Sequence, residues 1–369
     1  MKTKLYIILL LLVFGAETGA TIRYVSKTGT NIEPCTTWTT ASTTIMGAYS
    51  LCSANDTIMI GEGVYEENLV FYDGTIPISL IGVNPATTII DVRGLNPYAI
   101  YAKCNLLLSG LTVYGKGIDG DNLCVGIIPH PNPTTGLKVT IENCILRNAS
   151  MGVFFDDGSL HISKSSILDA NTAIMYDQVY LNTDEVLDVS DCFILSHNNA
   201  PVFNGMKVAI WVWYGTILFR NNIVRGSKIP VPLADPMLYA INVTSGVRGG
   251  HISNNIFAGF LFYLTRIRYA SSNDPGSLQV HNNILTYSRD EDQFDGAITN
   301  QRKNTFIYNN ILIDNGAGLN CDTCHYANYN SFFRNKVNIW GTVNNPVGNL
   351  YVDPMVTNDS TAVTAFDQL

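Results

Sequence analysis

Charged side chains are scarce in this sequence. Only 14% of its 369 residues are charged, against about 25% in ordinary domains, and the formal net charge is −8. This composition excludes coiled coils and charge-rich disordered chains. No dense tract of lysine or arginine occurs, so nucleic acid is not an expected partner.

Long hydrophobic runs are also missing after the N-terminus. The one marked run extends from Leu5 to Phe14, after Lys2 and Lys4 and before the small residues Thr18 and Ala20. It falls short of the roughly 20 residues that span a membrane and has the features of a secretory signal peptide. We therefore expect residues 1–20 to be cleaved and the protein to be secreted, at the cell surface or periplasmic.

Asparagine and glycine supply much of the polarity, and many of the asparagines belong to a repeated phrase. The phrase is short, apolar at alternate positions and bounded by Gly, Asn or Pro, which is typical of a strand that ends at a corner. Its clearest copies are Ile141-Glu-Asn-Cys-Ile-Leu146, Val189-Ser-Asp-Cys-Phe-Ile194, Phe219-Arg-Asn-Asn-Ile-Val224, Ile252-Ser-Asn-Asn-Ile-Phe257, Val280-His-Asn-Asn-Ile-Leu285 and Ile307-Tyr-Asn-Asn-Ile-Leu312.

The fourth position of the phrase forms a column with a spacing of 20 to 33 residues. A fixed phrase with variable spacing indicates a solenoid whose coils differ in their loops. Asparagine side chains stacked at one corner can hydrogen-bond along the axis as a ladder. The column comprises Cys144, Ser165, Cys192, Asn222, Asn255, Asn283, Asn310 and Asn330.

At this point the chain resembles the right-handed parallel β-helix, or pectin-lyase-like, superfamily, in the manner of bacterial secreted repeat proteins. The opening phrases Tyr24-Val-Ser-Lys-Thr-Gly29 and Asp56-Thr-Ile-Met-Ile-Gly-Glu-Gly-Val-Tyr65 and the closing Asn349-Leu-Tyr-Val-Asp-Pro354 support this. The resemblance implies an all-β chain: one β-helix solenoid of roughly ten coils with an Asn ladder over residues 21–355, then a tail or cap over 356–369. The fold hosts lyases, hydrolases, epimerases, adhesins and spacers, so it leaves the activity open.

A second strand precedes each asparagine phrase and predicts an outward surface. With Ile210 and Ile241 inward, strand alternation turns Trp211, Trp213 and Asn242 outward, and the same pattern places Tyr263 in this column. Exposed aromatic rings beside amides suit the apolar faces and hydroxyl edges of sugars. The alternative is that a long loop covers the tryptophans.

The sequence indicates catalytic groups less clearly than it indicates the outward aromatic surface. Because lyases of the resembled superfamily need a base and a cation, Arg266 and Arg302 are candidates for the base, and we expect both at one register of adjacent coils. Asp156 and Asp177 share an outward column and are candidates for glycoside hydrolysis. A calcium site is a weaker prediction, as carboxylate clusters of this kind are more often solvated; its ligands would be Asp290, Asp292 and Asp295.

Eight cysteines fit an oxidising compartment. We expect disulfides between Cys35 and Cys52 and between Cys104 and Cys124, each flanking one segment, although spacing alone does not fix the pairing. The column positions Cys144 and Cys192 predict inert core thiols.

The segment Cys321-Asp-Thr-Cys324-His325 has the form of a c-type haem attachment motif. A local disulfide or two packed cysteines is the favoured interpretation, because Cys321 occupies an ordinary strand position.

Together these features predict a secreted β-helix protein that binds extracellular polysaccharide and could cleave it as a lyase or hydrolase. No cofactor is expected beyond the calcium and haem alternatives. The competing hypotheses are a non-catalytic surface or matrix protein, for which self-association stays open, and an exported monohaem protein.

Overall fold

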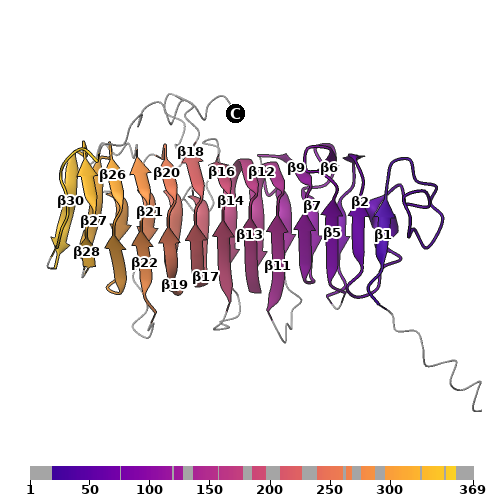
Figure 1. The fold of residues 1–369 in the computed structure, drawn as a ribbon, viewed down its shortest axis with the longest axis horizontal. Helices are drawn as coiled ribbons and strands as arrows, with labels where there is room; N and C mark the ends of the chain where they lie inside the picture. Colours follow the sequence, from indigo (N-terminus) through magenta and orange to yellow (C-terminus); the bar gives the residue numbers. More distant parts are fainter. Residues whose placement is uncertain are drawn as a thin grey trace, which may run out of the picture.

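The computed structural model describes residues 19–74, 76–118, 120–127, 136–156, 158–177, 185–196, 208–226, 239–260, 263–267, 276–286, 296–324, 326–344 and 346–354. Their strands join into a single 30-stranded sheet, and each pairs in parallel with strands of the adjacent coils. The sheet winds into an elongated parallel β-helix whose coils follow one another along the long axis (Figure 1).

Sheet 1 is the set of strands that precede the asparagine column. It contains β1 (Ile22–Val25), β2 (Thr57–Ile60), β5 (Ile78–Gly82), β8 (Leu106–Ser109), β11 (Leu137–Glu142), β13 (Gly158–Ser163), β15 (Val186–Ser190), the second parts of β17 (Val208–Arg220) and β19 (Tyr239–Ser253), β22 (Leu278–His281), β25 (Thr305–Tyr308) and β28 (Tyr326–Asn328).

Sheet 2 follows the corner and contains β3 (Gly63–Tyr65), β6 (Thr88–Asp91), β9 (Thr112–Gly117), the first parts of β12 (Ile145–Asp156) and β14 (Ser166–Asp177), β16 (Phe193–Ser196), β18 (Ile223–Gly226), β20 (Ile256–Ala258), β23 (Ile284–Thr286), β26 (Ile311–Ile313) and β29 (Ser331–Phe333).

Sheet 3 completes each coil and contains β4 (Leu69–Phe71), β7 (Tyr98–Ala102), β10 (Leu123–Ile127), the second parts of β12 and β14, the first parts of β17 and β19, β21 (Tyr263–Ile267), β24 (Gly296–Asn300), β27 (Ala317–Cys324) and β30 (Val337–Val343).

One continuous hydrophobic core fills the coils. Alternate strand residues point inward, so equivalent positions such as Ile141, Ile162 and Val189 stack from coil to coil and are fully buried. At the N-terminal end the short helix α2 (Ile45–Tyr49) contributes Ile45 and Ala48 to this core. The predicted all-β parallel solenoid is therefore confirmed.

The asparagine ladder is present at the corner between sheets 1 and 2. Asn283 illustrates the pattern: its Nδ2 donates to the Ile252 carbonyl (2.9 Å) and to Asn310 Oδ1 (3.0 Å), and its Oδ1 accepts from the Asn255 backbone N–H (3.0 Å). The ladder runs from Asn222 through Asn330 and continues to Asn349, one rung further than predicted. Each rung satisfies backbone groups that the corner takes out of the strand pairing.

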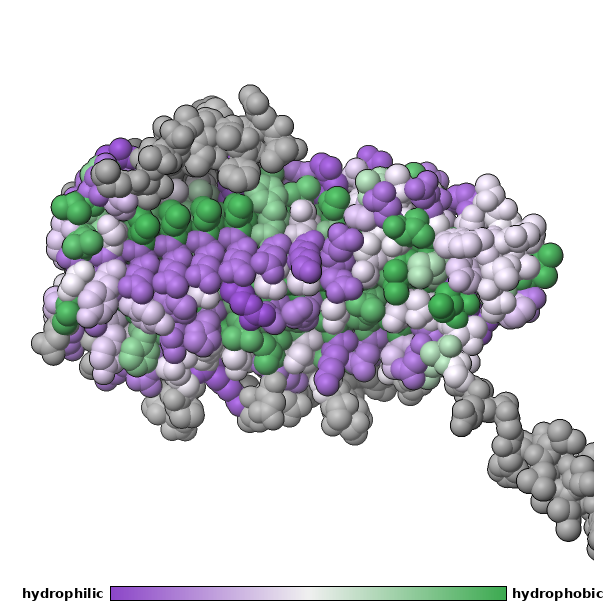
Figure 2. Space-filling view, viewed as in Figure 1, coloured by the Kyte–Doolittle hydropathy of each residue, from purple (hydrophilic) through white to green (hydrophobic). Residues whose placement is uncertain are grey.

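The residue before each ladder position has a left-handed backbone, which asparagine tolerates better than most residues. Asn221, Asn254, Asn282 and Asn309 occupy this place in successive coils and are exposed. A hydrophilic band runs lengthwise along the molecule, beside a row of hydrophobic residues (Figure 2). The strands thus set a regular surface as well as a regular core.

Two terminal predictions fall outside the described residues, namely most of the signal peptide (residues 1–20) and the C-terminal tail (356–369). Within the described part, no helix is long and apolar enough to cross a membrane.

We predict that Asn283→Ala lowers the free energy of unfolding by about 2–4 kcal/mol, because the substitution leaves the buried Ile252 carbonyl and Asn255 N–H without their side-chain partner and removes one of the bonds to Asn310 Oδ1. Urea denaturation measures this. The neighbouring variant Asn282→Gly is the control: its position is exposed and left-handed, so the change should stay within about 1 kcal/mol. Equal losses in the two variants would contradict a special role for the ladder.

Candidate functional site

The outer side of sheet 3, hereafter the site face, carries the predicted outward column. Phe154 lies beside Met175, Met175 beside Trp211 and Trp211 beside Asn242 in successive coils, as expected. Their inward neighbours, including Ile174 and Ile210, belong to the core.

Beyond Asn242 the predicted register is wrong. The strand partner of Asn242 is Arg266, whereas Tyr263 pairs with Tyr239. Arg266 in turn pairs with Thr299, so Arg266 and Arg302 do not share one register. The predicted register is wrong because β21 begins at Tyr263, whereas the hydrophobic residues before Tyr263 suggest an earlier start. The side chains of Tyr263 and Arg266 lie outside the described residues.

Trp211 is not an exposed platform. Its side chain is 2% exposed and packs with Val208 and Tyr239 in a small cluster separate from the core. Trp213 is half-buried and its ring stacks on that of Trp211, with centroids 5.2 Å apart and planes 2° from parallel. The covered alternative is thus correct for Trp211, and Trp213 forms the more accessible side of the pair.

Asn242 is fully buried, and neither its Oδ1 nor its Nδ2 has a hydrogen-bond partner. The Nε1 of Trp213 is likewise buried and unpartnered. Thr244, in the same strand as Asn242, donates from Oγ1 to the Trp213 carbonyl at 2.5 Å and so ties the two strands together. An unsatisfied buried polar group costs about 1–3 kcal/mol, so these three atoms are a local cost to the stability of the fold.

Asp156 and Asp177 lie directly opposite each other in β12 and β14, as predicted from their shared column. Both are half-buried and stand on the site face, one strand alternation beyond Phe154 and Met175. Their inward neighbours Phe155 and Tyr176 stack at 5.7 Å and fix the local strand geometry. The two carboxylates are therefore held at equivalent positions of adjacent coils.

Three tyrosines that the sequence analysis overlooked lie on the same face. This tyrosine cluster comprises Tyr72, Tyr98 and Tyr101, of which Tyr72 is 67% and Tyr98 39% exposed. Tyr101 pairs through Gly126 with Phe154, which places Tyr101 in the column of Phe154, two residues before Asp156 and two coils away from it. The signal was available: the Ala-Ile pair that precedes Met175 and Trp211 also precedes Tyr101.

The tyrosine cluster differs from the other aromatic rows in its ring geometry. The ring of Tyr101 is tilted by 58° to that of Tyr72 and by 51° to that of Tyr98, so the rings do not cover one another's faces. On sheet 1, by contrast, His281 and Tyr308 stack at 4.8 Å with planes 1° from parallel. Stacked rings of this kind bury their faces against each other and join coils, whereas tilted rings keep a face for a ligand.

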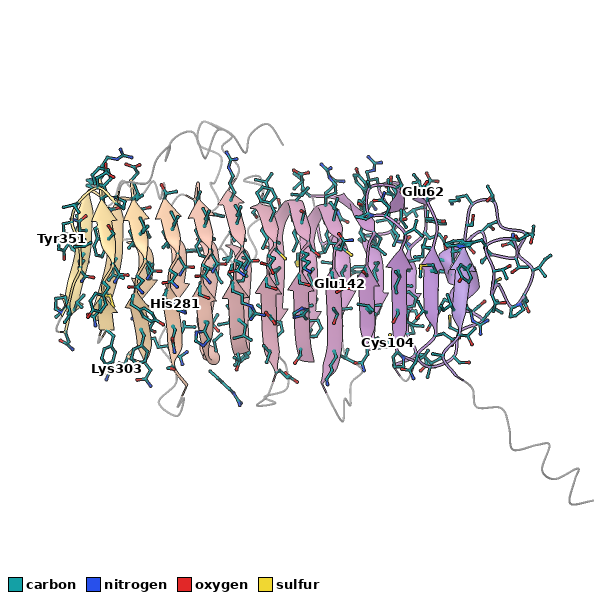
Figure 3. All side chains as sticks on the ribbon, viewed as in Figure 1. Glu62, Cys104, Glu142, His281, Lys303 and Tyr351 are labelled. Carbon is teal, nitrogen blue, oxygen red and sulfur yellow. A yellow bond between two sulfur atoms is a disulfide. The ribbon has the colours of Figure 1, made fainter. Side chains whose placement is uncertain are left out.

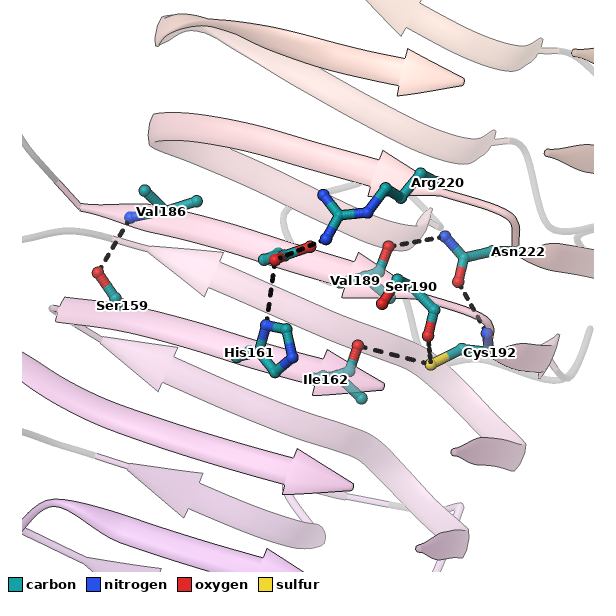
Figure 4. A network of polar contacts seen from close by, with 10 residues as sticks. Ser159, His161, Ile162, Val186, Val189, Ser190, Cys192, Arg220 and Asn222 are labelled. Carbon is teal, nitrogen blue, oxygen red and sulfur yellow. Dashed lines mark hydrogen bonds and ion pairs between the residues drawn. The ribbon is translucent and has the colours of Figure 1, made fainter. Parts of the chain in front are cut away.

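Sheet 1 also carries a charged network across three coils (Figure 4). Asp188 Oδ2 lies 3.1 Å from His161 Nδ1 and 3.0 Å from Arg220 Nη2. His161 and Arg220 are each about two-fifths exposed, so the network borders solvent. Glu142 and His281 mark the same outer side of this sheet in Figure 3. The three residues of the charged network come from β13, β15 and β17 and hold these strands together across the sheet.

Arg302 is not available as a catalytic base. Its side chain is 1% exposed, and the guanidinium donates to the carbonyls of Val247, Arg248 and Gly276, the last two at 2.9 and 2.8 Å. Arg302 thus satisfies backbone carbonyls of the two preceding coils. The proposed calcium ligands Asp290, Asp292 and Asp295 lie outside the described residues, and the described part holds no cluster of three metal-ligating side chains.

The predicted disulfides of Cys35 with Cys52 and of Cys104 with Cys124 are absent, and all four cysteines are free thiols. Cys52 follows α2, and its Sγ donates to the Ala48 carbonyl at the end of that helix; Cys124 donates inside the core to the carbonyls of Val113 and Arg147. Burial raises the pKa of Cys52 and Cys104 to about 11 and that of Cys124 to about 12.

The ladder cysteines Cys144 and Cys192 are buried, and burial raises the pKa of each thiol to about 11, which agrees with inert core thiols. Cys321 and Cys324 form a disulfide and are fully buried, as the favoured interpretation of that motif required. The bond leaves neither sulfur for a thioether link, so these residues do not fit an attached haem; His325 is outside the described residues.

No family model and no curated protein matches the chain. Among solved structures, the pectate lyase Pel9A aligns with 94% of this chain and 85% of its own at a TM-score of 0.55 and 11% identity. The catalytic unit of a GH87 α-1,3-glucanase from Streptomyces thermodiastaticus aligns with 81% of this chain and 64% of its own (TM-score 0.53, 13% identity). XylC, solved in complex with xylose, aligns with 91% of this chain and 87% of its own (TM-score 0.52, 12% identity). The fold is therefore the right-handed parallel β-helix that these structures share.

Thiol titration tests the cysteine assignment. We predict that unfolding in denaturant without reductant exposes six thiols, those of all cysteines except Cys321 and Cys324. The native protein should react slowly, because burial and raised pKa values keep the thiolate fraction small. A count of two thiols would instead mean that the two sequence-predicted disulfides form.

Acid should weaken the fold partly through His281. Burial, and then the nearby His251, lowers the pKa of His281 below its usual 6.5. Between the lowered pKa and 6.5 the unfolded chain binds more protons, so the free energy of unfolding falls as the pH drops below 6.5. We predict that His281→Gln reduces the stability lost between pH 7 and pH 5, measured by urea denaturation. An unchanged loss would contradict this assignment.

Proposed function

We propose that this protein is exported, binds an extracellular polysaccharide along the site face and hydrolyses it at Asp156 and Asp177. The observation that carries the proposal is an exposed tyrosine cluster two coils away from an in-register carboxylate pair on the same sheet. The N-terminal sequence, with its basic start and short apolar run, supports export.

The tyrosine cluster suits sugar rings. A pyranose presents an apolar C–H face that packs on an aromatic ring and hydroxyl edges that bond to polar groups. Tyr72 and Tyr98 are exposed enough to receive such a ring, and the ammonium of Lys103 lies 5.7 Å from the Tyr72 ring centroid. The buried Gly126 and the half-buried Phe154 lie between the cluster and the aspartates.

The carboxylate pair suits hydrolysis. Neighbouring parallel strands lie about 4.8 Å apart, close to the ~5–5.5 Å between the two carboxyl groups of retaining glycosidases. In that reaction one carboxylate attacks the anomeric carbon while the other, protonated, gives its proton to the departing glycosidic oxygen. The second group then accepts a proton from the water that releases the sugar. Elimination is less well supported because Arg302 is engaged with backbone carbonyls.

The compared structures support a carbohydrate substrate in general terms. They are a pectate lyase, an α-1,3-glucanase and XylC in complex with xylose, so they guide the first choice of polymers.

A non-catalytic assembly role is the second candidate, favoured by one observation. Apolar side chains gather at the last described coil, where Leu350 is 57% and Val352 59% exposed beside Tyr351. An end-to-end contact between copies would cover them. Self-association that rises with concentration and is lost in a Leu350→Asp/Val352→Asp variant would favour this role.

Polygalacturonate, α-1,3-glucan and xylan are the substrates for the first test, with calcium and with chelator. We predict retention of the protein on one polymer and release of reducing ends from it. A Tyr72→Ala/Tyr98→Ala variant should lose at least about tenfold in affinity, and Asp156→Asn or Asp177→Asn should lower the rate by about 10³-fold or more while retention persists.

Tyr326→Ala is the matched control, since Tyr326 is similarly exposed but stacks on Phe306 on sheet 1. Detection of unsaturated products would mean that the protein cleaves the polymer by elimination and not by hydrolysis. Neither retention nor products on any polymer would overturn the carbohydrate proposal.

A further inference from the structure

The first described residues meet a buried carboxylate at the N-terminal end of the β-helix. Gly19 and Ala20 are exposed and have no regular structure. Thr21 is half-buried, and its carbonyl accepts from the Thr57 N–H at 2.9 Å, which joins it to β2. Thr21 is also the residue that becomes the N-terminus if the predicted signal peptide is cleaved after Ala20.

The backbone nitrogen of Thr21 lies against the carboxylate of Asp56. Asp56 is 1% exposed, and its Oδ1 accepts from the Thr21 N–H at 2.7 Å. The other oxygen, Oδ2, accepts from Arg23 Nε at 3.2 Å and from the Ser53 N–H at 2.9 Å. One oxygen of this carboxylate therefore faces the nitrogen of Thr21, and the other faces a guanidinium.

From this geometry we infer that the Ala20–Thr21 bond is a processing site and that the α-ammonium formed there makes an ion pair with Asp56. Hydrolysis by the signal peptidase of the export machinery adds the hydroxyl of water to the Ala20 carbonyl carbon and its hydrogen to the Thr21 nitrogen. The new carboxylic acid then gives up its proton and the amine gains one, which leaves a carboxylate on Ala20 and an ammonium on Thr21. This inference rests on the export part of the proposed function.

The surroundings of the Thr21 nitrogen suit a positive charge. An ammonium makes a hydrogen bond to a carboxylate that is roughly twice as strong as the bond from a neutral amide. Because Thr21 is half-buried, the remaining N–H groups of the ammonium can face water. Arg23 and Cys52 are titratable neighbours of the carboxylate: Arg23 binds its opposite oxygen, and burial, then Asp56, raises the pKa of Cys52 to about 11.

Mass spectrometry of the secreted protein tests the processing site. The full-length chain is expressed in a secreting bacterium, and the expected product begins at Thr21. Two purified chains then test the ion pair, one beginning at Thr21 and the other at Gly19. The second chain is the control, because its two additional exposed residues carry the ammonium away from Asp56 while keeping the Thr21 N–H.

The pKa of the α-amino group is the direct measurement. Its usual value is about 7.7–8.0, and pairing with the Asp56 carboxylate raises it. We expect the Thr21 amine to titrate at least about one pH unit above the Gly19 amine, as measured from the pH dependence of amine acetylation. At pH 7 this shift makes acetylation of the Thr21 amine about tenfold slower.

Thermal stability should follow the same titration. The ion pair stabilises the fold fully below about pH 7.7, and this stability is lost as the pH rises through the raised pKa of the amine. The thermal midpoint of the Thr21 chain should exceed that of the Gly19 chain by on the order of 1–3 °C at pH 6.5, with no difference at pH 10.5. Asp56→Asn should abolish the difference at every pH; if that variant does not fold, the two chains with Asp56 decide the question.

The outcomes distinguish this inference from the proposed function. A secreted protein whose first residue is not Thr21 would overturn the processing site. Equal pKa values for the two amines would overturn the ion pair and leave export and polysaccharide hydrolysis intact. A chain that is neither exported nor cleaved would remove the export part of the proposed function and the processing site with it.

Discussion

Stacking of one coil on the next in fixed register is the constraint on which the rest of this molecule depends. Parallel strands lock each residue beside its equivalent, and the buried ladder from Asn222 to Asn349 repeats the lock with side-chain amides. A slip of one residue would turn every core side chain outward and break every rung. The ladder therefore fixes the outer surface as firmly as it fixes the core.

Regular register explains why separate segments of the chain can build one site. Tyr101, Phe154 and Asp177 are far apart in sequence but occupy β7, β12 and β14, which lie within four consecutive strands of sheet 3. Rings that stack squarely, such as His281 on Tyr308, contribute cohesion between coils. Rings that tilt, as in the tyrosine cluster, give up some of that cohesion and keep surface available for a partner.

Sequence patterns were dependable where alternation and the repeat acted together. They gave the ladder positions, the shared column of Asp156 and Asp177 and the column from Phe154 to Asn242. They failed at Tyr263, where the strand starts later than its apolar neighbours suggest. They also failed for Cys35, Cys52, Cys104 and Cys124, because cysteine spacing says nothing about how strands direct each thiol.

By itself the sequence determined the solenoid, its corner and which residues alternate inward, because these follow from the period of the strand and the chemistry of a stacked amide. Tertiary structure alone decided which outward residues meet solvent. Trp211 and Tyr72 both stand outward, yet one is buried and the other exposed. Exposure depends on what packs above a strand, and no local pattern in that strand encodes it.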